Sequence, residues 1–204
     1  MNTTAAVLDH DEAEAHHDLS DKTALGFWLY LMTDCVLFAT LFATFAVLRN
    51  NTGAGESRAE MFNLSFVFIE TILLLVSSLT AGMAVAALRT GSKQLVSWLL
   101  GLTFLFGAGF VGMEIYEFTK LVNEGNGPHA GALHSAYFVL VGTHGLHIVV
   151  GLLWIIALVT WILRRGITGT FRKRLGLFSL FWHFLDIIWI FIFTIVYLFG
   201  VLAI

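Results

Sequence analysis

Two pairs of residues within strongly apolar stretches carry side chains that could do chemistry. His144 and His147 stand three residues apart in LVGTHGLHIVVG, and His183 and Asp186 have the same spacing in FWHFLDIIW. On a helix this spacing places both members of a pair on one face, about one turn apart. Imidazole and carboxyl groups placed in this way could ligate a haem, relay protons or hydrogen-bond to a neighbouring helix.

Four further acids lie in similar apolar surroundings: Asp34, Glu70, Glu114 and Glu117. No Lys or Arg lies deep in any of the stretches that contain them. In a membrane such acids must be protonated, paired with histidine, or in contact with lipid headgroups and water. Together with the two pairs above, these acids form one candidate network of polar residues.

A b-type haem is the first interpretation of these residues. It needs one axial histidine from each of two helices. His144 or His147 could pair with His183, and Gly142 and Gly145 would leave room for the ring. The predicted depths of His183 and His144 in the membrane differ, which argues against a shared haem.

The second interpretation is a proton relay through Asp34, His183 and Asp186, because imidazole titrates near neutral pH. The third is that the polar groups form hydrogen bonds between helices, each contributing roughly 0.6–2 kcal/mol. We favour the third interpretation.

In its sharpest form, the third interpretation pairs His144 with Glu114, or with Glu70 as the next candidate. His147 then bonds to Asp34 or to a backbone carbonyl. Either bond would satisfy a polar group that otherwise costs several kcal/mol in hydrocarbon.

The composition requires a membrane protein. Hydrophobic residues make up 58% of the 204 residues and charged residues 12%, whereas soluble chains carry roughly 25% charged residues. The net charge of −3 and the lack of a basic patch give no sign of nucleic-acid binding. Cys35 is the single cysteine, which excludes an internal disulfide, a CxxC redox pair, an iron–sulfur cluster held within this chain and a two-thiolate copper site.

Five long apolar runs predict an all-α, polytopic membrane protein with five transmembrane helices. Each exceeds the roughly 20 residues that cross the hydrocarbon. We place the helices at residues 25–49, 64–88, 95–119, 133–163 and 176–203, all within one membrane domain, 23–204. Residues 1–22 form an acidic, histidine-containing tail without Lys or Arg before Lys22. We expect this tail to be disordered rather than a cleaved signal peptide.

The distribution of basic residues predicts the orientation. With five spans, eight of the 11 Lys and Arg residues fall on the side of the membrane that holds the N-terminus. They are Lys22, Arg89, Lys93, Arg164, Arg165, Arg172, Lys173 and Arg174. Because basic loops stay in the cytoplasm, we expect a cytoplasmic N-terminus and a periplasmic C-terminus.

Four motifs, GFWLYLMTDCVLF, GAGFVGMEIYEF, VGTHGLHIVVG and FWHFLDIIWIF, together resemble subunit III of the haem-copper respiratory oxidases. The resemblance runs from about residue 25 to the C-terminus. The five-helix form is similar to subunit III of ubiquinol oxidases of the cytochrome bo type. One departure is Asp34, since many members of the family carry Glu at the matching position.

The resemblance implies a noncatalytic subunit without haem or copper, which are expected in the partner subunit I. It implies contacts with subunits I, II and IV, bound phospholipid, and support of proton uptake in a complex that oxidises ubiquinol and reduces dioxygen. By this resemblance, Asp34 and Glu70 border a lipid cleft, while His144, His147, His183 and Asp186 join helices.

The implied location is the bacterial inner membrane. Two alternatives stay open: subunit III of a cytochrome c oxidase, and a stand-alone b-type membrane cytochrome. The N-terminal histidines could also bind a metal, although a polar tail explains them as well.

Overall fold

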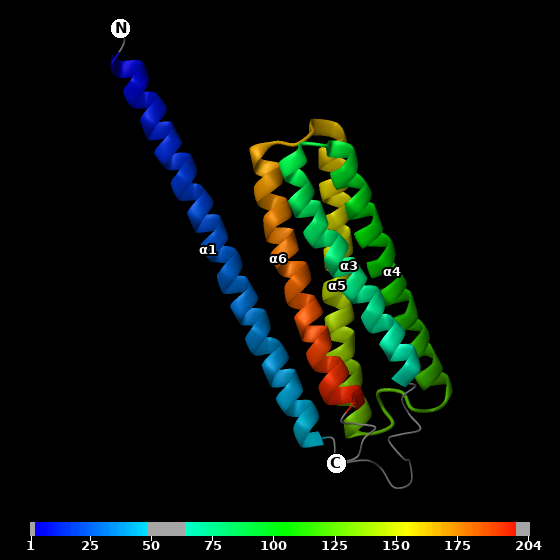
Figure 1. Cartoon of the computed structure of the whole chain (residues 1–204). Coiled ribbons are helices and arrows are strands. Elements are labelled where there is room, and N and C mark those ends of the chain that lie inside the picture. The colour runs from blue at the N-terminus through cyan, green and yellow to red at the C-terminus, as the bar shows by residue number, and fades with distance from the viewer. Residues whose placement is uncertain (1–2, 49–63, 199–204) are drawn as a thin grey trace. The chain divides into compact units, whose positions relative to one another are not determined.

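The structure is a computed structural model that describes the backbone of residues 3–48 and 64–198 and the side chains of residues 22–48 and 64–198. Every element in these ranges is helical (Figure 1). The elements are α1 (Thr3–Leu48), α3 (Leu64–Ala87), the 3₁₀ turn η1 (Leu88–Thr90), α4 (Lys93–Asn123), α5 (Ala132–Arg165), α6 (Gly169–Ile192) and the π-helical segment η2 (Phe193–Leu198).

In the part of the chain that the structure describes, five helices are long and apolar enough to cross a membrane. These candidate spans are Lys22–Leu48, Leu64–Thr90, Lys93–Asn123, Ala132–Arg165 and Gly169–Leu198. The prediction of an all-α protein with five helices of membrane-spanning length is therefore confirmed, and the chain is of the multi-pass membrane type. The orientation of its termini stays a prediction.

The first and last helices begin earlier than the sequence predicts. The side chain of Thr168 accepts a hydrogen bond from the backbone N–H of Phe171 at 3.2 Å, and this cap starts α6 at Gly169. Helical backbone also covers residues 3–21, where the sequence predicts a disordered tail. The Ala and Glu residues of that stretch are strong helix formers. That the tail is disordered stays a prediction.

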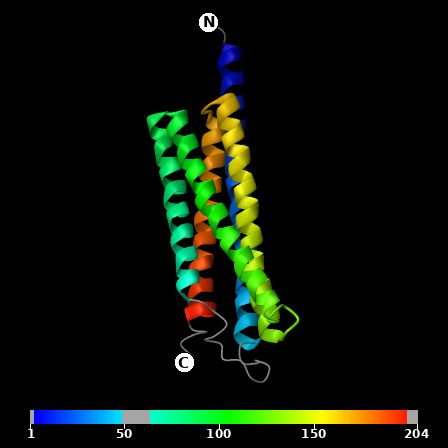
Figure 2. The ribbon, with the colours of Figure 1, turned by 90° about the vertical axis from the view of Figure 1, so that its right-hand side faces the viewer.

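The chain divides into two compact units, residues 1–37 and 38–204. The first unit is the N-terminal part of α1. In the second unit, α3, α4, α5 and α6 lie side by side as a bundle (Figures 1 and 2). Each helix of this bundle packs on the next in sequence, and α6 also packs on α3, which closes the bundle.

Two tryptophans of α6 anchor that closure. The indole N–H of Trp182 donates to Ser77 Oγ at 3.1 Å, and that of Trp189 donates to Thr71 Oγ1 at 3.0 Å. A Cβ placed on Gly151 would lie 2.5 Å from the Trp182 ring. Glycine in α5 is therefore what allows this large ring to fill the space between helices.

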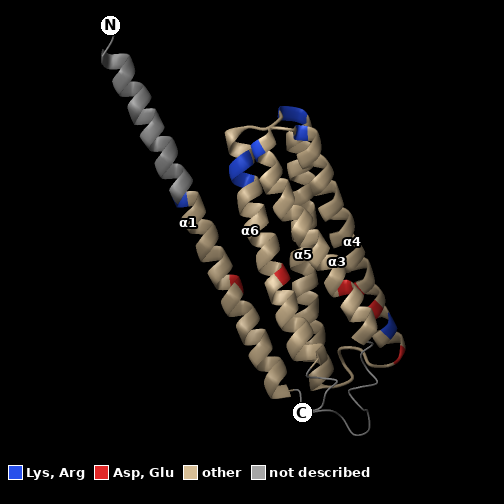
Figure 3. Ribbon diagram, in the orientation of Figure 1, with Lys and Arg blue, Asp and Glu red and all other residues tan. Residues whose placement is uncertain are grey.

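The charges of the second unit are separated along its length. Among the described residues, most Lys and Arg gather at the end where α3 connects to α4 and α5 connects to α6, whereas the acids lie nearer the opposite end (Figure 3). Lys120, in the last turn of α4, is the exception. The basic end carries Arg89, Lys93, Arg164, Arg165 and the run 172–174.

Candidate functional site

A chain of buried hydroxyl and carboxyl groups joins three elements near the α4–α5 end of the bundle. Tyr197 of η2 donates to Glu117 Oε2 of α4 at 3.1 Å, and its hydroxyl lies 2.9 Å from that of Tyr137 of α5. Both tyrosines are fully enclosed, and Glu117 is 8% exposed. The π-helical turn buries the consecutive residues Val196 and Tyr197, which brings the Tyr197 hydroxyl inward.

Glu70 of α3 lies close to these hydroxyl and carboxyl groups. Its side chain is 0% exposed, and neither carboxyl oxygen has a hydrogen-bond partner among residues 22–48 and 64–198. It lies close to the carboxyl groups of Glu117 and Glu114. A buried polar group without a partner is unusual and points to a function or a missing ligand.

Glu114, one turn from Glu117 on α4, packs against the backbone of α5. A Cβ on Gly145 would lie 2.6 Å from Cδ of Glu114. The absence of a side chain at Gly145 therefore makes the space for this carboxyl. At Gly142 the neighbour is the ring of Phe118, whose Cε2 would lie 3.5 Å from an added Cβ.

The predicted hydrogen bond between His144 and Glu114 is wrong. His144 is fully buried, and neither of its ring nitrogens has a hydrogen-bond partner in the described part of the chain. Its imidazole stacks on Trp189 at 5.3 Å between centroids and meets Phe110 edge-on at 5.9 Å. The environment of His144 is thus aromatic, and Glu114 turns to Gly145 instead.

His147 bonds to the second of its two predicted partners, a backbone carbonyl. Its Nδ1 lies 2.7 Å from the carbonyl oxygen of Thr143, one turn earlier on α5. The ring of Phe38 also lies 5.4 Å from the His147 ring between centroids.

His183 and Asp186 share a face of α6 but have different partners. His183 Nδ1 lies 2.7 Å from the carbonyl oxygen of Ser179 in its own helix. The side chain of Asp186 lies beside that of Ser78 on α3 and near His183. Its Oδ1 has no hydrogen-bond partner among residues 22–48 and 64–198.

Asp34 belongs to the first unit of the chain. Its side chain hydrogen-bonds with that of Tyr30, one turn earlier on α1. The expectation that Asp34 and Glu70 border a lipid cleft stays a prediction.

The surroundings of His144 do not fit a haem. Its imidazole is enclosed by the rings of Trp189, Phe110 and Phe38, which a porphyrin would have to displace. Within residues 22–48 and 64–198, no group of three or more His, Cys, Asp or Glu side chains is arranged to hold a metal ion.

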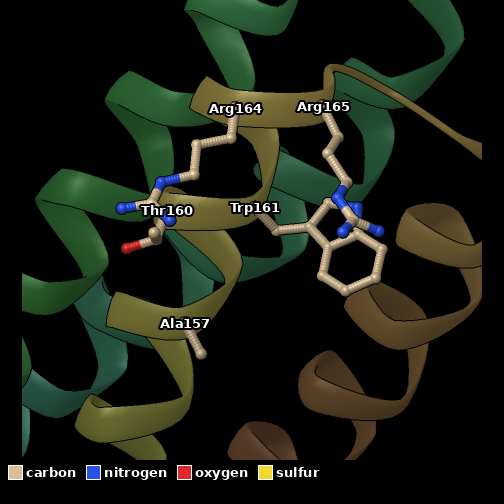
Figure 4. A pocket seen from close by; sticks show the side chains of 5 residues that line it. All are labelled: Ala157, Thr160, Trp161, Arg164 and Arg165. Atoms are coloured by element: carbon tan, nitrogen blue, oxygen red, sulfur yellow. The ribbon is translucent and has the colours of Figure 1, made fainter.

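A second feature lies at the basic end of the bundle. A pocket of about 380 Å³ is lined by Ala157, Thr160, Trp161, Arg164 and Arg165 (Figure 4). The guanidinium carbon of Arg165 lies 4.9 Å from the centroid of the Trp161 ring, and that of Arg174 lies 4.5 Å from it. Two cations thus share one indole, beside an opening that would accept an anionic group.

Comparison with known proteins decides the family. Residues 9–201 match the family described as cytochrome c oxidase subunit III. The chain belongs to this family. The subunit III assignment made from the four motifs is confirmed, and the chain is a subunit III of the haem-copper oxidases.

The relatives of this chain are subunits of oxidases that are named for different electron donors. The cytochrome bo(3) ubiquinol oxidase subunit 3 of Pseudomonas putida is 53% identical over 186 residues, 91% of this chain and 90% of that protein. The quinol oxidase subunit 3 of Bacillus spizizenii is 46% identical over 94% of this chain and 96% of that protein's length. The cytochrome c oxidase subunit 3 of Bacillus sp. strain PS3 is 45% identical, with 88% and 86% covered.

Sequence reasoning missed three aromatic members of the site in this subunit III: Tyr137, Tyr197 and Trp189. A signal for the tyrosines was available. A buried tyrosine hydroxyl usually finds a hydrogen-bond partner, and Tyr137 and Tyr197 are two of only four tyrosines in the chain. Tyr197, near the C-terminal end of its helix, could have been matched with an acid at the same end.

Proposed function

We propose that this chain is the accessory subunit III of a proton-pumping ubiquinol oxidase in a bacterial inner membrane. The observation that carries the proposal is the 53% identity, over 91% of the chain, to a relative named as a ubiquinol oxidase subunit. A second relative that is 53% identical, from Pseudomonas aeruginosa, is also named as a ubiquinol oxidase subunit, which favours quinol as the electron donor.

In this proposal the chain itself is noncatalytic. Dioxygen reduction takes place at haems and copper in subunit I, and this chain contacts subunits I, II and IV. The aromatic enclosure of His144 supports this division, because it leaves that histidine unsuited to bind haem.

Purification of the tagged chain in mild detergent tests the proposal. The copurifying polypeptides should contain haem, and the complex should oxidise ubiquinol but not reduced cytochrome c. Oxidation of cytochrome c would identify the alternative donor. A Soret band belonging to the isolated polypeptide would instead support a stand-alone b-type cytochrome and overturn the proposal.

A second part of the proposal is that the chain holds phospholipid and thereby stabilises subunit I and its uptake of protons. The pocket beside Trp161 supports this part, because Arg164 and Arg165 line it and Arg174 packs on the same indole. Cationic and aromatic side chains near a membrane surface are typical of sites for lipid headgroups.

Native mass spectrometry of the complex measures the retained lipid. Changing both Arg164 and Arg165 to Gln should reduce the anionic phospholipid that copurifies. Arg89→Gln, at the same end but outside the pocket, is the matched control. Equal lipid retention in both variants would show that the pocket is not a lipid site.

A further inference from the structure

The acids of α4, together with Glu124 at its C-cap, form a line from the surface of the bundle to its interior. Glu124 and Lys120 are exposed at 51% and 54% and lie 3.8 Å apart at the α4–α5 end. Glu117 is 8% exposed and Glu114 4%. Spacings of three and four residues keep these four side chains on one face of the helix, and the acids in this part of the bundle are visible in Figure 3.

Glu70 meets the inner end of this line from α3. Glu70 lies close enough to Glu117 and Glu114, and to Tyr137 and Tyr197, for a charge on one of these groups to act on the others. The groups that face this region are therefore three carboxyls from α3 and α4 and two hydroxyls from α5 and η2, with His144 nearby on α5.

No fixed cation compensates these carboxyls inside the bundle. The sequence has no Lys or Arg in residues 64–87, 94–119, 132–163 or 175–198. Lys120 acts on Glu117 but is itself paired with exposed Glu124. An ionised carboxylate without a cation is too costly in such surroundings, so Glu70 must carry its proton.

A neutral Glu70 still lacks two hydrogen bonds. Its O–H needs an acceptor and its carbonyl oxygen needs a donor, and residues 22–48 and 64–198 supply neither. Buried water is the usual partner of polar groups left in this state. The neighbouring carboxyl and tyrosine hydroxyl groups give such water further partners.

We propose that Glu70 is a proton-binding site inside the bundle, which exchanges its proton with water at the α4–α5 end through buried water, Tyr137, Tyr197 and Glu117. In the outward direction the Glu70 proton passes to bridging water. Each tyrosine oxygen then gains one proton and releases its own to the next group. Glu117 enters the step as a carboxylate, because it accepts the hydrogen bond of Tyr197 and lies near Lys120. It gains the proton that Glu70 loses, so the charge of the cluster changes only when Glu117 releases that proton to water.

This proposal does not depend on the electron donor or on the lipid site proposed above, although its test uses the assembled complex. The exchange site lies toward the α4–α5 end, whereas the pocket of Trp161 lies at the basic end of the same bundle. It requires only that the bundle is intact.

Infrared spectroscopy of the purified oxidase complex tests the proposal during transfer into D₂O. We expect a carbonyl band of a neutral carboxylic acid that shifts on deuteration and is lost in Glu70→Gln. Tyr197→Phe should keep this band and slow its shift about a hundredfold, the scale of assistance from a positioned proton-transfer group. Tyr116→Phe, on the exposed face of α4, is the control and should leave the exchange rate unchanged.

Three results would overturn the proposal. The first is a carboxylic band that survives Glu70→Gln in an assembled complex. The second is a Glu70 band that never shifts in D₂O. The third is that the Glu70 band exchanges as fast in Tyr197→Phe as it does in the control Tyr116→Phe. If Glu70→Gln fails to assemble, the two tyrosine variants still decide the outcome, since they retain Glu70.

Discussion

At the scale of single residues, His144 acts through its ring rather than through its nitrogens. The imidazole stacks on Trp189 and both nitrogens lack partners in the described part of the chain. We expect His144→Phe to leave the thermal stability of the complex unchanged or higher, because the ring contacts are kept and an unsatisfied polar group is removed. His144→Ala should cost about 2–4 kcal/mol through the cavity it leaves. Equal losses in both variants, measured by thermal unfolding, would contradict this account.

Tyr197 gives the opposite expectation, because its hydroxyl is fully bonded. Tyr197→Phe removes the hydrogen bond to Glu117 and the contact with the Tyr137 hydroxyl. Leaving those buried groups short of a partner should destabilise the complex by about 1–3 kcal/mol. Denaturation followed by tryptophan fluorescence would measure the change, with the exposed Tyr116→Phe as the unaffected reference.

The sequence predicted the polar residues of the site better than it predicted their partners. Glu70, Glu114 and His144 were selected because they are polar residues in apolar helices. The pairing of His144 with Glu114 was wrong because it depends on how each helix is rotated about its axis. Helices that are apolar on every side give no periodic pattern from which that rotation follows.

At the scale of elements, glycines decide how closely the helices approach. Gly151 lies against the ring of Trp182, whereas Gly112 on α4 has nothing within 4 Å of an added Cβ. Gly151→Ala should therefore destabilise the bundle by about 1–3 kcal/mol through overpacking. Gly112→Ala should be neutral or stabilise it by about 0.5–1 kcal/mol. Thermal unfolding of the two variants side by side would test this, and equal effects would refute it.

The existence of the membrane helices was predictable, since apolar runs of sufficient length have few other structures available. The residues at which these helices begin and end were harder to predict. The predicted start of the last helix near Gly176 ignored the cap at Thr168, because the basic residues that follow Thr168 were assigned to the loop. The π-helical segment η2, which follows α6, could not be predicted from the apolar pattern, since all its residues are compatible with an α-helix.

At the scale of the whole molecule, the basic residues predict the orientation of the chain. A reporter fused after Ile204 should be active in the periplasm, and one inserted between Gly166 and Arg172 should be active in the cytoplasm. The reason is that eight of the 11 Lys and Arg residues are predicted on the side of the membrane that holds the N-terminus, and basic loops stay in the cytoplasm. Reporter activities in the reverse pattern would show that the chain is inserted the other way.

The accessory role proposed for the chain predicts a mild effect of its removal. Deleting it should leave the haem spectra of the remaining complex largely intact, because the haems are held elsewhere. Turnover should begin normally and decline sooner than in the intact complex. Loss of both haems, with subunit I still present in the membrane, would contradict this role.

The π-helical segment Phe193–Leu198 also bears on which insertions and deletions the chain tolerates. A π-helix holds more residues in a turn than an α-helix does, since its hydrogen bonds reach five residues instead of four. Removing one residue from this segment should let the backbone close into ordinary α-helix without breaking the span. The same deletion would swing Tyr197 around the helix, away from Glu117. A single-codon deletion here should thus preserve membrane insertion while separating the C-terminal turn from the buried acids, an effect that no substitution in the segment reproduces.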